Sequence, residues 1–569
     1  MQSALERAQA WLKEPYDAET QAAAQALIDQ GGDALADAFY QDLDFGTGGL
    51  RGIMGVGTNR INKYTLGAAT QGLANYLNKQ FPNEEIKVAI AHDSRHNSKP
   101  FARLVAEVLS ANGIRVYLYE DLRPTPALSF AIRHLGCQSG IVLTASHNPP
   151  AYNGYKVYWS DGGQLVPPHD KAVINEVRAV QVSEIRYDFK EELIEMIGAE
   201  VDAAYLKEVN KQSLSDAGKE DLSIVFTSIH GTSITLVPPA LEQAGFKKVS
   251  IVEEQAKPDG DFPTVKSPNP EEPEALSMAL KQAERLNADM VIGTDPDADR
   301  VGIAVRNLDG ELELLNGNQA ASVLIYYLLE QWKEKGKLTG NEYVAKTIVT
   351  TDLITKIAEA YQVPCPECLT GFKWIADIIR NREGEMTFIG GGEESYGYMI
   401  GDFVRDKDAV ASAVMLAEAA AYAKSKGSSF YEMLIDAYHK FGFYLEVLVS
   451  LKREGMKGQE EIAQMMQDFR TKTPDTIAGE RIIKVLDYQS SEAKDLVHMS
   501  SESIDLPKSN VVQFITEEGT KITARPSGTE PKIKFYVSVN DHLGELKDFR
   551  EGKAKLERRL AEITKALGL

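Results

Sequence analysis

The order of apolar and polar positions along this 569-residue chain predicts several successive blocks of helices and strands. In residues 1 to about 40, apolar side chains recur at helical spacing, which predicts two amphipathic helices. Short apolar runs and longer amphipathic stretches then alternate, with a strand predicted at 87–91, a helix at 100–112 and a strand at 114–119. This alternation is typical of βαβ units with a parallel sheet.

The strand–helix alternation returns twice further along the chain. A second block contains predicted strands at 222–229, 248–252 and 290–293 and predicted helices at 237–244 and 274–286. A third block runs from about 318 to 440 and contains a predicted strand at 386–389. Three successive α/β domains are therefore expected, with a polar, helical passage near 170–220 after the first.

The pattern changes after about residue 440. Strands are predicted at 443–451, 511–516 and 532–539, and a long charged helix at 544–567. A run of strands followed by a terminal helix predicts a separate, smaller α+β domain. The expected domains are residues 1–210, 211–316 and 317–440 for the α/β domains and 441–569 for the α+β domain.

A loop with two prolines and a glycine follows the apolar run at 139–143, which is predicted to be a buried strand. Ser146 is therefore expected on an exposed loop at the carboxyl end of a strand, where open α/β sheets bind ligands. With His147 beside it and Lys156 ten residues later, Ser146 could be a covalent nucleophile. The alternative is a polar turn whose serine caps a helix.

Three carboxylates, Asp295, Asp297 and Asp299, directly follow the strand predicted at 290–293. So many negative charges close together repel one another unless a cation relieves them, and hard oxygen ligands favour Mg²⁺ or a similar ion. An EF-hand is excluded, because it would require glycine and glutamate where this chain has arginine. The alternative is an acidic turn on the surface.

Other charged loops are less specific. The glycine-rich residues 46–52 could bring backbone N–H groups and Arg51 to an anion, although the dinucleotide-binding spacing fails. Asp93 and Arg95 follow a strand directly and are interpreted as loop-bracing groups. The charged residues 405–408 precede a helix, so capping is an alternative to chemistry there.

Two further glycine-containing loops suit sugar and phosphate recognition. Glu393 and Ser395 lie on a glycine-rich loop after a strand, where their oxygens could bind neighbouring hydroxyl groups of a sugar. Arg525 and Ser527 precede a glycine and a threonine, a combination of donors that suits a phosphate monoester. Read alone, each of these loops is also compatible with a simple turn.

The composition of the chain excludes several classes of function. Lys plus Arg total 62 and Asp plus Glu 83, and the resulting net charge of −21 argues against bulk binding of nucleic acid or anionic membrane. No apolar run approaches the roughly 20 residues of a membrane span, and no signal peptide is evident. The three cysteines predict no disulfide framework and a cytoplasmic location; Cys365 and Cys368 are interpreted as structural thiols rather than a redox pair or half a zinc site.

Taken together, four motifs resemble the α-D-phosphohexomutase superfamily, and most of all its phosphoglucomutases. They are TASHNPP at 144–150, GTDPDADR at 293–300, GGEESYG at 391–397 and RPSGTEPK at 525–532, and the similarity covers about residues 40–540. The resemblance implies three related α/β domains and a smaller C-terminal α+β domain around a large central cleft. It also implies Mg²⁺ as cofactor and glucose 1,6-bisphosphate as intermediate and activator.

The resemblance implies a role for each matching residue. Ser146 would carry the phosphoryl group, and Asp295, Asp297 and Asp299 would hold Mg²⁺ against it. Arg51, Lys156 and Arg300 would complete the catalytic pocket, with Lys407 and His147 as alternative general acid/base groups. Glu393, Ser395, Thr370 and Gly371 would bind the sugar. Arg525, Ser527, Gly528 and Thr529 would bind the phosphate that is not transferred.

The implied reaction interconverts glucose 1-phosphate and glucose 6-phosphate in a monomer or weak homodimer. Three alternatives keep part of this picture. The sugar could be mannose, glucosamine or a pentose; the protein could bind sugar phosphates without turnover; or it could be a phosphatase. The intact Ser146 and aspartate cluster argue against a purely binding role, since binding alone needs neither.

Overall fold

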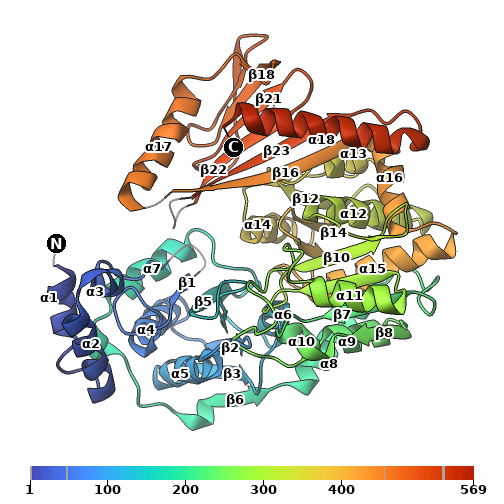
Figure 1. Cartoon of the computed structure of the whole chain (residues 1–569). Helices are drawn as coiled ribbons and strands as arrows, with labels where there is room; N and C mark the ends of the chain where they lie inside the picture. Colours follow the sequence, from blue (N-terminus) through green and yellow to red (C-terminus); the bar gives the residue numbers. More distant parts are fainter. Residues whose placement is uncertain (1–2, 46–48, 454, 528–531, 569) are drawn as a thin grey trace. The chain divides into compact units, whose positions relative to one another are not determined.

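The computed structural model describes residues 3–45, 49–453, 455–527 and 532–568 (Figure 1). The chain divides into two compact units. The first comprises Met1–Leu315, Phe372–Gly384 and Ser395–Lys426, and the second Asn316–Gly371, Glu385–Glu394 and Gly427–Leu569. Because the chain passes between the units several times, neither unit is one continuous segment.

The N-terminal region contains three helices, α1 (Ala4–Ala10), α2 (Ala18–Gln30) and α3 (Gly32–Phe39), so the prediction of two is wrong. The chain turns sharply between α2 and α3 because Gly31 and Gly32 both have positive φ, at 60° and 59°. Trp11 packs edge-on against Phe39 and holds these helices on a small apolar core of their own.

The first sheet has the strand order β1-β5-β4-β2-β3-β6. Its strands are β1 (Gly49–Ile53), β2 (Lys87–His92), β3 (Arg115–Tyr119), β4 (Ser139–Leu143), β5 (Tyr152–Trp159) and β6 (Ile194–Ile197). The inner strands β4, β2 and β3 are parallel, which confirms the predicted βαβ unit, whereas β1 and β5 are antiparallel additions.

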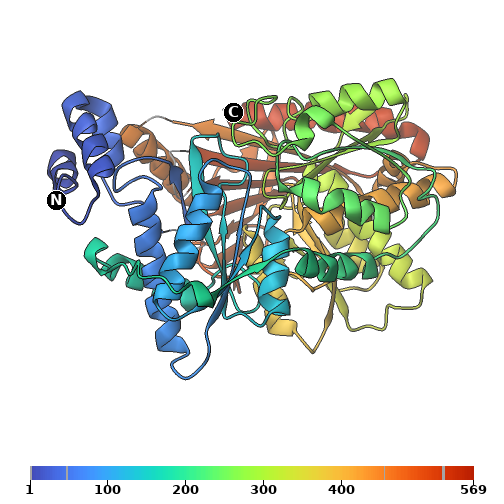
Figure 2. The same ribbon diagram turned by 90° about the horizontal axis from the view of Figure 1, so that it is seen from below.

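Helices cover both faces of this sheet. Helix α5 (Ser98–Ala111) links β2 to β3, and α6 (Thr125–His134) links β3 back to β4 in the opposite direction. Since both crossovers are right-handed in such folds, the two helices must lie on opposite faces, as Figure 2 shows. Helices α4 (Lys63–Gln80) and α7 (His169–Ala179) complete the covering layer.

The second sheet also belongs to the first unit and has the order β11-β10-β9-β7-β8. Its elements are β7 (Ser223–Thr227), β8 (Lys248–Ile251), β9 (Met290–Thr294), β10 (Val301–Arg306), β11 (Leu312–Leu314), α8 (Ala199–Lys211), α9 (Val237–Gln243), α10 (Glu253–Ala256) and α11 (Ser277–Leu286). The antiparallel hairpin of β9 and β10 encloses the aspartate loop. Three elements from later in the chain, α14 (Phe372–Arg382), β15 (Gly397–Ile400) and α15 (Ala409–Ser425), also belong to this unit.

The second unit begins with a parallel arrangement of β12 (Glu342–Thr347), β13 (Glu367–Cys368) and β14 (Thr387–Glu393). Strand β14 contains the predicted strand at 386–389. Helices α12 (Gly317–Glu334), α13 (Leu353–Ala360) and α16 (Phe430–Phe441) pack in the same unit. This is the third α/β region expected from the sequence.

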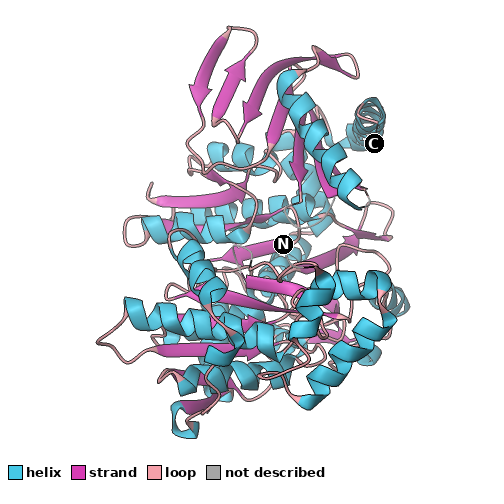
Figure 3. Ribbon diagram, turned by 90° about the vertical axis from the view of Figure 1, so that its left-hand side faces the viewer, coloured by secondary structure: helices cyan, strands magenta, loops and turns pink. Residues whose placement is uncertain are grey.

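The C-terminal sheet is antiparallel, with the order β16-β23-β22-β21-β18-β19-β20 and β17 paired with β18. Its elements are β16 (Phe443–Lys452), α17 (Gly455–Thr471), β17 (Thr476–Ile477), β18 (Glu480–Asp487), β19 (Glu492–Asp495), β20 (Ser500–Ser503), β21 (Val512–Thr516), β22 (Lys521–Pro526), β23 (Lys532–Asp541) and α18 (Phe549–Ala566). Three of these strands and α18 were predicted, although α18 begins five residues later than expected. Figure 3 distinguishes the strands and helices by colour.

The mixed sheets with helices, followed by a C-terminal sheet, confirm the predicted fold class of three α/β domains and an α+β domain. The four domain boundaries stay predictions. Among the described residues, none of the helices has both the length and the apolar character that a membrane span requires.

Candidate active site

The loop after β4 places the Ser146 hydroxyl in a buried cluster of charged groups. Ser146 Oγ donates to Asp295 Oδ2 at 2.8 Å and lies 3.3 Å from His147 Nδ1. The serine is only 3% exposed, so the expectation of an exposed serine is wrong: the aspartate loop after β9 covers it. Its φ of 51° places it in the left-handed region, which non-glycine residues rarely adopt.

Arg95 holds the Ser146 loop in place through hydrogen bonds to its backbone. Its guanidinium donates to the carbonyl oxygens of Pro149 at 2.8 Å and Tyr152 at 3.2 Å, and also to those of Ser146 and Asn148. Asp93 Oδ2 lies 3.3 Å from Arg95 Nε and balances the buried charge. The geometry supports the interpretation of Asp93 and Arg95 as loop-bracing groups.

The three aspartates after β9 form a buried group that could hold a metal ion. One carboxylate oxygen from each of Asp295, Asp297 and Asp299 lies within 4.8 Å of the others. Oδ1 of Asp297 and Oδ1 of Asp299 are buried and accept no hydrogen bond from any described residue. Buried carboxylate oxygens without donors are costly unless a cation binds them, so this donor set fits a hard divalent ion.

The pKa values of the aspartates show how the charge is shared. Burial and then the neighbouring Asp297 and Asp299 carboxylates raise the pKa of Asp295 well above its usual range. Burial alone would also raise the pKa of Asp299, but Lys407 and Lys156 outweigh it and hold that pKa below its usual range. The protein cations therefore stabilise part of the negative charge of the cluster.

Two lysines from different parts of the first unit contact the same carboxylates. Lys156 Nζ, on β5, lies 2.7 Å from Asp297 Oδ2 and 3.3 Å from Asp299 Oδ2. Lys407 Nζ, in the segment before α15, lies 3.1 Å from Asp299 Oδ2. Arg300 Nε lies 3.7 Å from Asp299 Oδ1. A phosphoryl group on Ser146 would thus meet several positive charges in addition to any metal ion.

Arg51 and His147 lie at the edge of this cluster. Arg51 is exposed and donates to Asn148 Oδ1 at 3.0 Å, which links β1 to the serine loop. Burial, followed by the charges of Arg300 and Arg51, holds the pKa of His147 well below its ordinary value. The imidazole is therefore neutral near pH 7, and it is a weaker base than an ordinary histidine.

The remaining predicted residues are divided between the units. Ser395 belongs to the first unit, whereas Glu393, Thr370, Gly371, Arg525 and Ser527 belong to the second. Within the second unit, Glu393 Oε1 accepts a hydrogen bond from the Gly371 backbone N–H at 2.8 Å, so two of the predicted sugar-binding residues meet. Gly528 and Thr529 lie outside the described residues.

Glu394, beside Glu393, is a second acidic group in this part of the structure. Burial and then the charge of Glu393 raise the pKa of Glu394 to about 7, against the lowering effects of Lys534 and Arg525. The predicted phosphate-binding arginine therefore lies within electrostatic reach of the predicted sugar-binding loop. Glu393, Glu394 and Arg525 all belong to the second unit.

Several residues that contact the cluster were not predicted from the sequence. Thr125 Oγ1 donates to Asp297 Oδ2 at 3.1 Å, and its backbone N–H donates to the Asp297 carbonyl at 2.8 Å. Glu271 Oε1 lies 2.5 Å from Arg300 Nη1. A lone threonine or glutamate so far from its partner in sequence carries no local signal. Asp406, next to Lys407, was noted only as part of a charged capping cluster.

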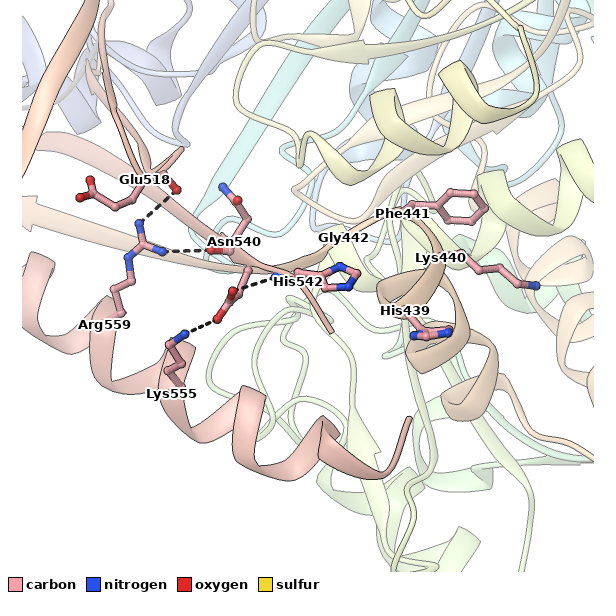
Figure 4. A pocket seen from close by; sticks show the side chains of 10 residues that line it. His439, Lys440, Phe441, Gly442, Glu518, Asn540, His542, Lys555 and Arg559 are labelled. Carbon is pink, nitrogen blue, oxygen red and sulfur yellow. Dashed lines mark hydrogen bonds and ion pairs between the residues drawn. The ribbon is translucent and has the colours of Figure 1, made fainter. Parts of the chain in front are cut away.

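A cavity of about 640 Å³ in the second unit, at the end of α16 near β23 and α18, is lined by none of the predicted site residues (Figure 4). Two of its basic side chains are paired with carboxylates: Lys555 Nζ lies 2.6 Å from Asp541 Oδ2, and Arg559 Nε lies 2.5 Å from Glu480 Oε1. The cavity therefore presents little free positive charge to a ligand.

The two cysteines of the CxxC sequence show no sign of activation. Cys368 is buried and its thiol donates to the Lys346 carbonyl at 3.6 Å. Burial raises the pKa of Cys365 to about 11 and that of Cys368 well above its usual value. Thiols with raised pKa values are poor nucleophiles, which supports a structural role.

The comparisons with known proteins agree with this arrangement. Residues 42–183, 203–310 and 316–441 match the descriptions "Phosphoglucomutase/phosphomannomutase, alpha/beta/alpha domain" I, II and III. The phosphoglucomutase of Staphylococcus haemolyticus (strain JCSC1435) is 38% identical over 507 residues, which are 88% of this chain and 91% of that protein. The phosphoglucomutase of Staphylococcus aureus (strain MRSA252) is 39% identical over 88% of this chain and 90% of its own.

Two solved structures share the fold. The phosphoglucomutase pp63/parafusin from Paramecium superposes with a TM-score of 0.65 at 18% identity, covering 93% of this chain and 96% of its own. A phosphoglucomutase/phosphomannomutase family protein from Burkholderia thailandensis gives 0.62 at 16% identity, covering 91% and 96%. At such identities the likeness concerns the fold alone. Together with the domain matches and the sequence identities, however, it shows that this chain belongs to the phosphoglucomutase/phosphomannomutase family.

Proposed function

We propose that the chain has phosphoglucomutase activity and interconverts glucose 1-phosphate and glucose 6-phosphate through a phosphoserine at Ser146. One observation carries this proposal: the Ser146 hydroxyl donates to Asp295 at 2.8 Å within a buried group of three aspartates and two lysines. The sequence identity to proteins named phosphoglucomutase supports glucose over the other sugars.

Mg²⁺ is the metal ion that best suits the aspartate group. Asp295, Asp297 and Asp299 would hold it beside Ser146, and all three offer the hard oxygen ligands that this ion prefers. When bound, Mg²⁺ supplies positive charge that polarises the phosphoryl oxygens and lowers the barrier to their transfer.

The residues of the chain supply positioning and charge. Phosphoryl transfer needs an in-line approach and neutralisation of the charge on the equatorial oxygens. Lys156 and Arg300, which contact the aspartate cluster, and Arg51, which contacts the serine loop, would supply this positive charge. The bond between phosphorus and Ser146 Oγ breaks as the sugar hydroxyl oxygen forms its bond to phosphorus. The proton of that hydroxyl passes to a nearby base, for which Lys407 and His147 are the two candidates.

The other end of the substrate needs its own binding groups. Glu393, Ser395, Thr370 and Gly371 would bind sugar hydroxyls, and Arg525, Ser527, Gly528 and Thr529 the phosphate that is not transferred. Transfer to O6 of glucose 1-phosphate gives glucose 1,6-bisphosphate, which reverses its orientation and returns its O1 phosphoryl group to Ser146. Separate binding sites for metal and phosphate allow either end of this intermediate to be held.

A phosphosugar is the only partner that this reaction requires. We expect neither nucleic acid nor membrane as partner, because the chain is strongly acidic with a net charge of −21. A cytoplasmic monomer or weak homodimer would suffice.

The decisive experiment compares turnover of the 1-phosphates of glucose, mannose, glucosamine and ribose, with glucose 1,6-bisphosphate present. Glucose 1-phosphate is expected to react fastest. A faster reaction with another sugar would change the substrate but keep the mutase chemistry. Release of inorganic phosphate would indicate a phosphatase, and binding without turnover would indicate a regulatory protein.

A further inference from the structure

The side chain of Lys407 is almost completely buried where its ammonium group contacts Asp299. The lysine lies between β15 and α15, and its side chain is only 9% exposed although its ammonium lies 3.1 Å from Asp299 Oδ2. A buried lysine needs both space for its methylene groups and partners for its ammonium group. Two neighbours in the first unit, Gly397 and Asp406, meet these two needs.

Gly397, the last residue of the GGEESYG motif, leaves room for the methylene groups. A Cβ atom at this position would lie 2.0 Å from Lys407 Cδ and 2.7 Å from Lys407 Cγ, far closer than carbon atoms can approach. Gly397 is absent from the glycines with positive φ, so its backbone does not by itself demand glycine. Space for Lys407 is therefore what excludes any larger residue here.

Asp406 holds the ammonium group of Lys407 in place. It is 1% exposed, and its Oδ2 accepts hydrogen bonds from Tyr158 Oη at 2.6 Å and Gln164 Nε2 at 2.9 Å. Its Oδ1 accepts the Lys407 backbone N–H at 2.8 Å and lies 3.4 Å from Lys407 Nζ. The carboxylate is thus held from the first sheet while it faces the ammonium group.

The ammonium group of Lys407 therefore lies between two carboxylates, Asp406 and Asp299, with the Phe372 ring 5.7 Å away. Removing the Asp406 charge takes one of these two anions away from the ammonium group, and adding a methyl group at Gly397 displaces the methylene groups of the lysine. Either change moves the ammonium group without touching the aspartate cluster or Ser146.

We propose that Gly397 and Asp406 are positioning residues for Lys407, which act on the reaction only by holding this ammonium group at the aspartate cluster. The inference rests on the proposed function in one respect, namely that Lys407 contributes to phosphoryl transfer. It assigns the terminal glycine of the motif a role in the catalytic cluster rather than in sugar binding.

A double-mutant cycle tests this proposal in the full-length enzyme. Gly397→Ala and Lys407→Met should each lower kcat about 100-fold, a typical loss for one acid/base or charge-stabilising group, with KM for glucose 1-phosphate within about twofold of the wild type. The double variant should be within about threefold of Lys407→Met, because the glycine has nothing left to position. If the kcat losses of the two single variants multiply in the double variant, the proposal is wrong.

Asp406→Asn supplies an independent second variant, with the same expectations in the Lys407→Met background. Asp402→Asn, on the same segment but with a side chain 57% exposed, is the matched control for loss of charge. Gly544→Ala, where an added Cβ meets no atom within 4 Å, is the control for the added methyl group. Neither control should change kcat more than about twofold.

A measurement without turnover separates this inference from the proposed function. Lysine labelling with trinitrobenzenesulfonate, followed by peptide mass spectrometry, should show little modification of Lys407 in the wild type. Labelling should rise several-fold in Gly397→Ala and Asp406→Asn, as the amine leaves its buried position. Unchanged labelling would refute the positioning role even in an active enzyme. Increased labelling in a protein that does not interconvert glucose phosphates would refute only the proposed function.

Discussion

Single residues in strained conformations mark the loops around the Ser146 hydroxyl. Ser146, Ala298 and Tyr396 all have positive φ, at 51°, 53° and 67°, although none of them is glycine. Such conformations cost roughly 1 kcal/mol or more each and persist only where surrounding contacts enforce them. These three loops carry the hydroxyl, the aspartates and the motif that ends at Gly397, so the strain coincides with the candidate chemistry.

Replacement of Ser146 by alanine should abolish the phosphoenzyme and lower turnover at least 1,000-fold, because the transferred group then has no acceptor. The side chain is small and its one strong hydrogen bond is to Asp295, so the melting temperature should stay within a few degrees of the wild type. Intact-protein mass spectrometry and a coupled assay measure the two effects. Ser500→Ala, on exposed β20, serves as control, and near-normal turnover in Ser146→Ala would reject the nucleophile.

Removal of divalent metal should stop turnover while sugar-phosphate binding survives. The Oδ1 atoms of Asp297 and Asp299 accept no hydrogen bond within the described part of the chain, and Lys156, Lys407 and Arg300 balance the negative charge of the cluster only in part. Dialysis against excess EDTA should lower kcat to below about 1% of the starting value, and Mg²⁺ should restore it. Calorimetric titration with glucose 6-phosphate checks that the site still binds. Full activity in excess chelator would contradict the metal site.

At the scale of helices and strands, the ends of strands and the start of a helix position the side chains of the candidate active site. β4 and β9 belong to different sheets of the first unit, yet the loops that follow them meet at Ser146 and Asp295. Arg95, after β2, ties the first of these loops to its own sheet through four carbonyl groups. Helix α15 fixes the segment that holds Lys407, because Asp408 caps its first turn.

Asp408 should make the stability of the first unit depend on pH. Its Oδ1 accepts hydrogen bonds from the Val410 and Ala411 backbone N–H groups and from Tyr205 Oη, while its buried Oδ2 meets no donor in the described part of the chain. Burial therefore raises the pKa of Asp408 to about 6, against an ordinary value of 3.8. Between about pH 4 and pH 6 the folded state keeps the Asp408 proton that the unfolded chain loses. The contribution of Asp408 to the free energy of unfolding is therefore largest below about pH 4 and falls as the pH rises to about 6.

Asp408→Asn should remove this dependence, since the amide oxygen preserves all three hydrogen bonds and the amide carries no charge. The variant should be more stable than the wild type by about 3 kcal/mol at pH 7 and nearly equal to it at pH 4. Urea unfolding of both proteins at several pH values measures the difference. A variant that is less stable than the wild type at pH 7 would show that the folded protein stabilises the ionised carboxylate and that burial does not raise the pKa of Asp408.

Across the whole molecule, the features that could be predicted from the sequence are those formed by residues close together in the chain. The aspartate loop and the serine loop were predictable because ligands and turn formers adjoin a buried apolar strand. Thr125 and Glu271 were not, since each contacts the cluster from a distant part of the chain. Strands β19 and β20 were missed because they are short and polar; the residues of β20 are all exposed. The N-terminal helices were miscounted because two adjacent glycines divide an otherwise continuous amphipathic pattern.

The division into two units was also invisible in the sequence, which predicts the C-terminal sheet as a separate domain. In the second unit this sheet is joined to the third α/β region by a buried ionic network. Asp352 Oδ1 lies 2.6 Å from Lys521 Nζ, on β22, and 3.0 Å from Lys346 Nζ, on β12. Gln513 Nε2, on β21, donates to the Ile348 carbonyl at 2.9 Å.

Asp352→Ala should therefore loosen both parts of the second unit together. The substitution removes the carboxylate that two buried lysines share, although Lys346 keeps Glu367 Oε1 at 2.6 Å. Because the Asp352 side chain is 35% exposed, solvent screens the pair and the loss should cost about 1 kcal/mol. Amide hydrogen exchange should accelerate in β12–β14 and in β21–β23 alike, while β2–β4 of the first unit keep their protection. Asp402→Asn, an exposed change in the first unit, is the control. Faster exchange confined to β21–β23 would show that the C-terminal sheet opens alone, and the ionic network would then not couple it to the α/β region.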